Sequence, residues 1–273
     1  MRMNVDTRRP LAALVLGLSG LAWLALWAWG NSPYAGYLSH DASAQLANGS
    51  PAALAWICTL GALARQPAGS AQLLVFLAGW LLMIVAMMLP TSLPLMAMFQ
   101  TIIRQHPRRR QLIALLVAGY LATWLACGVV THAGYEGWYA LVERTSWLRA
   151  NAWSIGASIV LLAGIYQLTP LKYYCLDRCR SPLSFIAAHW RGGSARLQAL
   201  RLGLHHGLFC VGCCWSIMLL MFVVVSSNLG WMLALGAVMA IEKNVPWGRR
   251  ISAPLGVILM GWGLTLILGT VIG

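Results

Sequence analysis

The chain has 273 residues, of which 60% are hydrophobic and only 9% are charged, and its formal net charge is +13. A soluble globular protein usually carries about 25% charged residues, so a single water-soluble core cannot bury this many apolar side chains. The composition therefore predicts one all-α polytopic membrane domain over residues 1–273. No P-loop, dinucleotide-binding loop or hydrolase triad occurs in the sequence, which argues against a nucleotide-dependent pump or a transferase.

Apolar windows predict seven membrane-spanning helices, because a bilayer core of about 30 Å requires about 20 helical residues and about 17 at least. The windows lie at about residues 11–29, 72–90, 111–131, 152–174, 204–225, 228–241 and 251–273. The sixth window is short, but residues 202–241 contain no charged residue and residues 226–230 offer a turn. We therefore interpret residues 204–241 as a helical hairpin.

The basic residues orient these helices. With the N-terminus in the cytoplasm, sixteen of the nineteen Lys and Arg residues, Lys172 among them, lie on the cytoplasmic side, as the positive-inside rule predicts. The positive charge then marks loops that face anionic lipid, and nucleic acid is not expected as a partner. This topology places an external loop at about residues 30–71 and a cytoplasmic loop at about residues 175–203.

The stretch HHGLFCVGCCW at residues 205–215 places several potential metal ligands in a predicted membrane helix. Residues three or four apart share one face of a helix. The resulting stripe consists of His206, Cys210, Cys213 and Cys214, and His205 lies beside it. A stripe of this kind indicates a binding face on the fifth predicted helix.

Cys175 and Cys179 lie four residues apart at the end of the preceding predicted helix, toward the same membrane face. The five thiols and His206 are therefore expected to converge near the cytoplasmic face. Thiolate and imidazole are ligands of Zn²⁺, Cu(I) and iron–sulfur centres, and cytoplasmic thiols stay reduced. The alternative is that the cysteines are small packing residues. The spacing matches no zinc finger, so the pattern leaves the metal open between copper and zinc.

Methionines surround two prolines in the second predicted helix, which continues to about residue 103. Pro90 and Pro94 are expected to bend or break this helix. Met87 and Met88 precede the break, and a thioether favours Cu(I) among the common metals. Methionine also fills irregular gaps in apolar packing, which is the alternative reading for each of them.

Glu242 and Lys243 end the sixth predicted helix, and ionisable groups at membrane depth tend to be functional. Glu242 either orients His205 or His206 behind the metal ligands or pairs with Lys243 or Arg249 among the lipid headgroups. On the outer side, Cys58 and Cys127 share one compartment, and nothing further in the sequence indicates that they pair.

Four segments resemble a bacterial family of unknown function described as predicted metal-binding integral membrane proteins. They read WLLMIVAMMLP, YQLTPLKYYCLDRCRSP, GLHHGLFCVGCCWSIMLLMFV and IEKNVPWG, within about residues 72–250. The resemblance implies an integral protein of the bacterial inner membrane with a metal site, and it implies no particular reaction. The matching positions are Met87, Met88, Pro90, Cys175, Cys179, His206, Cys210, Cys213, Cys214, Glu242 and Lys243.

We expect a protein of the bacterial inner membrane that binds a soft metal ion through a Cys/His/Met cluster, for metal handling or metalloenzyme assembly, with Cu(I) favoured over zinc. Its partners would be the lipid bilayer and a soluble or membrane protein that accepts the metal. A thiol or redox enzyme is an alternative, because C-x-x-C spacing supports thiol exchange. A metal-ion transporter is a second alternative. The sequence leaves open whether there is catalysis, the direction of transfer and the oligomeric state.

Overall fold

The computed structural model describes residues 8–30, 70–151, 153–190, 192–224 and 229–272, and the structural statements below concern these residues. Within them the chain forms helices and no strand, as the all-α prediction requires. The elements are α1 (Arg8–Gly30), α3 (Ser70–Thr91), α4 (Leu93–Ile102), α5 (Arg109–Arg144), α6 (Ser146–Ala150), α7 (Trp153–Gln167), α8 (Pro170–Arg180), α9 (Pro182–His189), α10 (Ala195–Val224), α11 (Leu229–Asn244), the 3₁₀ helix η4 (Gly248–Ile251) and α12 (Ser252–Ile272). The predicted external loop lies, from residue 31 to residue 69, outside the described residues.

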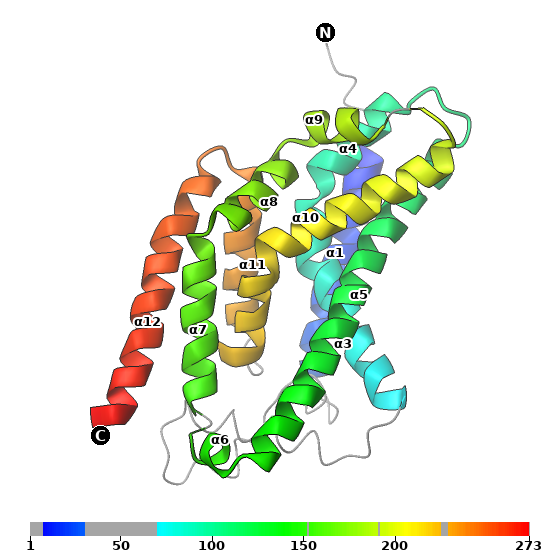
Figure 1. Ribbon diagram of the computed structural model, residues 1–273. Coiled ribbons are helices and arrows are strands. Elements are labelled where there is room, and N and C mark those ends of the chain that lie inside the picture. The colour runs from blue at the N-terminus through cyan, green and yellow to red at the C-terminus, as the bar shows by residue number, and fades with distance from the viewer. Residues whose placement is uncertain (1–7, 31–69, 152, 191, 225–228, 273) are drawn as a thin grey trace.

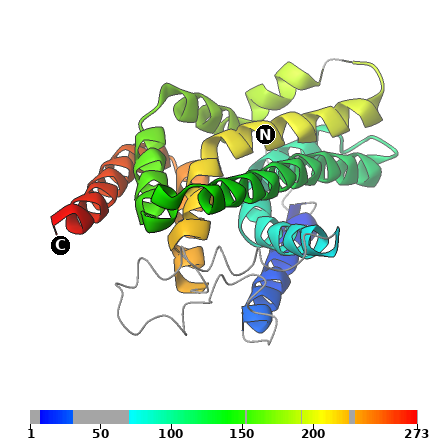
Figure 2. The same ribbon diagram turned by 60° about the horizontal axis from the view of Figure 1, so that its bottom comes forward.

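The helices form two outer groups with a central group of helices between them. Figure 1 shows α7 and α12 side by side at one edge and α1 and α3 toward the other, with α8, α10 and α11 between them. Helix α10 changes direction along its length, and α5 runs beside its first part, as Figure 2 also shows. The main buried core draws residues from α3, α4, α5, α8, α10 and α11, so it lies where the central helices meet.

Five helices are long and apolar enough to cross a membrane, namely α1, α3, α5, α10 and α12. Helices α7 and α8 would make a sixth span if they act together, although a bend of 63° separates them within the window predicted as one helix. Helix α11 has 16 residues, which is below the lower limit of about 17 for a span. The total of seven spans and the hairpin of α10 with α11 therefore stay predictions.

The outward surfaces of the edge helices are apolar. Leu14 and Leu21 of α1 are 60% and 64% exposed, and Val257 and Ile258 of α12 are 60% and 66% exposed. Soluble monomers rarely expose broad patches of such residues. This surface favours a lipid environment around the bundle.

The segment predicted as a cytoplasmic loop, residues 175–203, is largely helical, and its place on the cytoplasmic side stays a prediction. It contains the end of α8, the whole of α9 and the start of α10. Pro170 and Pro182 stand in the first turns of α8 and α9, where proline is tolerated, and the Thr169 side chain accepts a hydrogen bond from the Lys172 backbone N–H. Hydropathy windows did not detect these helices because their sequences are short or polar.

The predicted break at the prolines is confirmed, since α3 ends at Thr91 and α4 begins at Leu93. Pro90 has no N–H to bond the carbonyl of Ala86 four residues earlier. The Ser19 hydroxyl of α1 donates to that carbonyl at 2.6 Å instead. The break therefore creates a polar contact that attaches α1 to α3.

Helices α5 and α10 approach each other closely because glycine stands at the crossing on both sides. A Cβ atom at Gly119 would overlap the backbone carbonyl of Leu200, and one at Gly203 would overlap the backbone carbonyl of Leu116. Small residues permit such backbone contact between membrane helices. The close approach brings Tyr120 of α5 against the cysteine-bearing part of α10.

Replacing Gly203 by alanine should therefore lower the stability of the protein by about 1–3 kcal/mol, the usual cost of overpacking. The measurement is the unfolding midpoint of the purified protein in detergent. Gly17→Ala in α1 is the matched control, because no atom lies within 4 Å of a Cβ atom there. The control should leave the midpoint unchanged or raise it, since alanine favours helix by about 1 kcal/mol over glycine. Equal midpoints for the two variants would contradict the close packing of α5 on α10.

Candidate metal centre

The three cysteines of α10 and His206 are buried at the centre of the molecule. Cys210 and Cys213 are 0% exposed, Cys214 is 1% exposed and His206 is 4% exposed. Their spacing places them on the part of α10 that packs against α8 and α11. The structure thus gathers the α10 residues that the sequence pattern selects as ligands.

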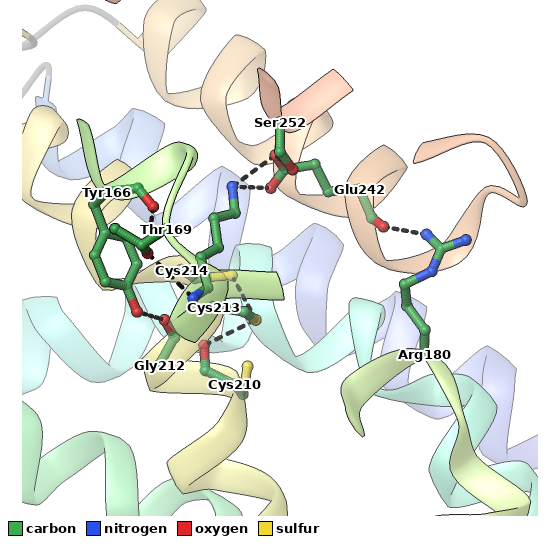
Figure 3. Close-up of polar contacts among 10 residues, drawn as sticks. Tyr166, Thr169, Arg180, Cys210, Gly212, Cys213, Cys214, Glu242 and Ser252 are labelled. Carbon is green, nitrogen blue, oxygen red and sulfur yellow. Dashed lines mark hydrogen bonds and ion pairs between the residues drawn. The ribbon is translucent and has the colours of Figure 1, made fainter. Parts of the chain in front are cut away.

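Helix α8 brings a further thiol to this cluster. The Sγ atom of Cys213 lies 3.5 Å from Sγ of Cys214 (Figure 3). The same atom lies 3.8 Å from Sγ of Cys179 on α8. Cys175 faces the α10 backbone, since a Cβ atom built at Gly212 would lie 2.6 Å from its Sγ atom. Cys175 is therefore adjacent to the cluster, while Cys179 takes part in it directly.

Lys243 of α11 binds the first cysteine of the stripe. Its Nζ atom donates to Sγ of Cys210 at 2.8 Å and to the Thr91 hydroxyl at 3.4 Å. The hydroxyl of Tyr120 lies 3.1 Å from the same sulfur. Because Lys243 is buried, its ammonium group needs a partner of opposite charge or good hydrogen bonds. A thiolate at Cys210 would meet that need.

The two methionines before the prolines have different surroundings. Sδ of Met88 lies 3.7 Å from Nζ of Lys243, so this thioether belongs to the surroundings of Cys210. Met87 points to α11 instead, where a Cβ atom built at Gly236 would lie 2.7 Å from its Cε methyl group. Met88 is the better placed of the two candidate thioether ligands.

The two histidines of α10 also differ. The buried ring of His206 stacks on Tyr120 with centroids 5.7 Å apart, and its Nδ1 atom has no hydrogen-bond partner among the described residues. A buried polar atom without a partner requires an explanation, and one explanation is that this nitrogen binds a metal ion. His205 is exposed and lies against His189 of α9, away from the thiols.

Glu242 does not bind the residues expected from the sequence. Its carboxylate accepts hydrogen bonds from Nζ of Lys172 at 2.7 and 3.0 Å and from the Ser252 hydroxyl at 2.7 Å (Figure 3). Arg249 pairs with Asp177 at the surface instead. The expectation that the basic charges face anionic lipid does not hold for Lys172, because its side chain is fully buried and neutralised by Glu242.

Arg180 connects the end of α8 to the end of α11. Its guanidinium group donates to the carbonyl of Glu242 and, at 2.8 Å each, to those of Val245 and Pro246. A cation favours the unpaired carbonyls at a helix C-terminus. Together with the pair of Lys172 and Glu242, this contact holds Cys179 beside α10.

Sequence reasoning missed Lys172, Tyr120 and Arg180 as parts of this region. One signal was present for Lys172, since a lysine within the apolar window at 152–174 is costly at membrane depth and calls for a partner. Tyr120 and Arg180 act across long sequence separations and gave no local signal. Cys127 is a half-buried free thiol in α5, and Cys58 lies outside the described residues, so their pairing stays untested.

The donor set suits a soft metal, although no three His, Cys, Asp or Glu side chains of the described residues are already arranged around one metal position. With metal–sulfur bonds of about 2.3 Å, two sulfurs on a tetrahedral ion lie about 3.8 Å apart. The Sγ atoms of Cys179 and Cys213 lie at this same separation, 3.8 Å. Thiolates and thioethers favour Cu(I) over harder ions, so the donor types present here fit a copper site.

A family model described as PpoB2, copper chaperone, matches residues 77–266. The match spans most of the chain and includes every residue of the cluster, and the chain belongs to this family of copper chaperones. No curated protein matches, and no solved structure matches. Copper handling, with transfer to metal-accepting proteins in general, is the activity class that the family supports.

The buried pair of Lys172 and Glu242 provides a test of how α8 is held. Lys172→Met should destabilise the protein by about 3–5 kcal/mol, because it leaves the Glu242 carboxylate buried without a cation. The double variant Lys172→Met with Glu242→Gln should recover part of this loss. Unfolding in detergent measures both.

The control is Asp177→Asn, which removes the surface pair with Arg249 at 3.4 Å. Exposed pairs contribute about 0–1 kcal/mol, so this variant should match the parent protein. If Lys172→Met lowers the stability to unfolding by no more than the control does, the buried pair of Lys172 and Glu242 is contradicted.

Proposed function

We propose that this copper chaperone is an integral protein of the bacterial inner membrane that binds Cu(I) between α8 and α10 and passes it to a metal-accepting protein. The observation that supports the proposal best is the cluster of Cys179, Cys213 and Cys214, whose sulfur atoms lie 3.5 and 3.8 Å apart. The thiols come from two helices, with Cys213 and Cys214 of α10 buried and Cys179 of α8 half-buried. Cargo copper in such a site would be partly shielded from solvent and still reachable from the side of α8.

The ligands divide into two groups around α10. Cys179 and Cys213 form the bridge between helices, and Cys214 is adjacent. Cys210, Met88 and His206 lie on the side of Lys243 and Tyr120, with Cys175 packed against Gly212. This set contains more donor atoms than one Cu(I) ion requires. The surplus favours stepwise exchange of ligands, which a chaperone requires.

Charge balance also favours Cu(I). Two thiolates and one Cu(I) ion carry a net single negative charge, which is costly to bury alone. Where Cys210 is one of the two thiolates, the ammonium group of Lys243, 2.8 Å from its Sγ atom, supplies the compensating positive charge. Zn²⁺ with the same two thiolates would leave the charge of Lys243 without a compensating anion. Lys243 therefore acts as a positioning and charge-balancing residue.

A location in the membrane is supported by the five long apolar helices and by the exposed leucines and isoleucines on α1 and α12. The cluster would then lie near the cytoplasmic face, where thiols stay reduced.

Copper loading tests the site directly. The full-length protein in detergent, incubated with Cu(I) under reducing, oxygen-free conditions, should retain copper in a fixed molar ratio after desalting. Cys179→Ser and Cys213→Ser should each weaken Cu(I) affinity at least about tenfold, as measured by competition with a coloured Cu(I) chelator. Cys127→Ser is the matched control, since Cys127 lies in α5 outside the cluster, and it should bind as the parent protein does.

A thiol exchange enzyme would give another result. It would retain no copper, and oxidation would crosslink Cys179 to Cys213 reversibly. Copper binding that is insensitive to Cys179→Ser and Cys213→Ser would contradict the proposed site.

Membrane integration has its own test. The expressed protein should stay in the membrane pellet after washing with alkaline carbonate and enter solution only with detergent, because α1, α3, α5, α10 and α12 bury their apolar surfaces in lipid. Release by carbonate alone would show a peripheral protein.

A further inference from the structure

A second group of histidines lies beside the thiol cluster, at the surface of the molecule. The rings of His189 on α9 and His205 on α10 face each other with centroids 4.8 Å apart and planes at 53°. His205 is exposed and His189 is half-buried. A ligand can therefore reach this pair from outside the bundle, unlike the buried thiols of α10.

His189 is prepared for coordination by its own helix. Its Nδ1 atom lies 2.8 Å from the carbonyl of Phe185. Because a carbonyl only accepts, Nδ1 carries the proton, and in a neutral ring Nε2 keeps its lone pair. Histidine ligands of metals are held in this way by a backbone carbonyl behind the ring. The ring also packs on Phe185 at 4.4 Å, which restricts its rotation.

The buried residue His206 lies between this histidine pair and the cysteines of α10. Phe185 contacts both His189 and His206, with ring centroids 4.4 and 5.7 Å apart. His206 has an Nδ1 atom without a partner among the described residues, and its ring stacks on Tyr120. The hydroxyl of Tyr120 lies 3.1 Å from Sγ of Cys210. Imidazoles and then thiols thus follow one another from the surface inward.

Donor softness changes in the same direction. Imidazole binds many first-row metals, whereas thiolate favours Cu(I) strongly. Arg201, close enough to His205 to interact with it electrostatically, opposes a divalent ion more than a monovalent one. The surface pair therefore fits a weak Cu(I) site, and the cluster fits a tight one.

From these observations we infer that His189 and His205 form a surface copper site, through which Cu(I) passes to and from the buried thiols by way of His206. The inference rests on the proposed copper-binding function. Transfer is a ligand exchange in which a Cu–N bond breaks as a Cu–S bond forms. Copper keeps its single charge, and a proton leaves any thiol that becomes a ligand and goes to water.

The test measures loading kinetics separately from affinity. The full-length protein in detergent receives Cu(I) from a coloured chelator complex, and the loss of colour gives the rate. His189→Phe keeps an aromatic ring against Phe185, and His205→Asn changes an exposed residue, so at least one variant should keep the fold. Each should slow loading at least about tenfold while changing the equilibrium affinity of the thiol site less than about twofold.

His132→Phe in α5 is the matched control, because His132 packs on Phe76 with ring centroids 5.0 Å apart and is not part of the histidine pair. It should load as fast as the parent protein. A second measurement uses a variant with Cys179, Cys210, Cys213 and Cys214 all changed to serine. This variant should retain a weaker Cu(I) site with nitrogen ligands in X-ray absorption, and His189→Phe should remove it.

The two proposals fail in different ways. A parent protein that retains no copper overturns the thiol site. Normal retention with wild-type loading rates in both His189→Phe and His205→Asn overturns the surface site. The surface site is also overturned if adding His189→Phe to the four-serine variant leaves its residual copper binding unchanged.

Discussion

Two buried lysines determine how the central helices meet. Glu242 and Lys243 are neighbours at the end of α11, so their side chains leave the helix in different directions. Glu242 pairs with Lys172 of α8, and Lys243 binds Cys210 of α10. In an apolar bundle each charge must have its partner. The electrostatic demand of two adjacent residues therefore fixes the positions of α8 and α10 relative to α11, and the thiols of Cys179 and Cys213 meet as a consequence.

The broken helix contributes to the same region from the other side. Beyond Pro90, the backbone of α3 turns, and the Ser92 N–H bonds the carbonyl of Leu89 at 3.1 Å. The carbonyl of Met88 then accepts from three hydroxyls, those of Thr91, Ser92 and Tyr120, at 2.8 to 3.3 Å. Two of these, Thr91 and Tyr120, also contact Lys243 or Cys210. The break at the proline thus places polar groups beside the sulfur of Cys210, and the hydroxyls satisfy the carbonyl of Met88.

Local periodicity was sufficient to find part of this arrangement. Positions three and four residues apart placed His206, Cys210, Cys213 and Cys214 on one face of α10, and Pro90 marked the end of α3. The partners of these residues could not be found in the same way. Lys172 was counted only as one of the basic residues on the cytoplasmic side, because such a count takes no account of a carboxylate 70 positions further along the chain.

The helices of the predicted loop at 175–203 were missed for a related reason. A search for apolar windows assumes that a helix near a membrane is apolar, and α8 ends instead in charged residues that bind across the bundle. A search for apolar windows cannot detect the role of Arg180, because that role depends on the carbonyls at the end of α11. Contacts of this kind follow from tertiary packing and are invisible to hydropathy.

The physical demands on a chaperone differ from those on a storage protein, and the proposed site would suit a chaperone. A closed site with all ligands fixed would hold copper tightly and release it slowly. Here Cys179 and Cys213 belong to separate helices, and the ammonium group of Lys243 lies 2.8 Å from the sulfur of Cys210. With Cys210 as a ligand in the proposed site, its sulfur would return to this ammonium group when copper leaves, so release would not expose an unpaired buried charge. A partner that accepts copper would then compete only with the metal–sulfur bonds, because the protein itself would compensate the charge left behind.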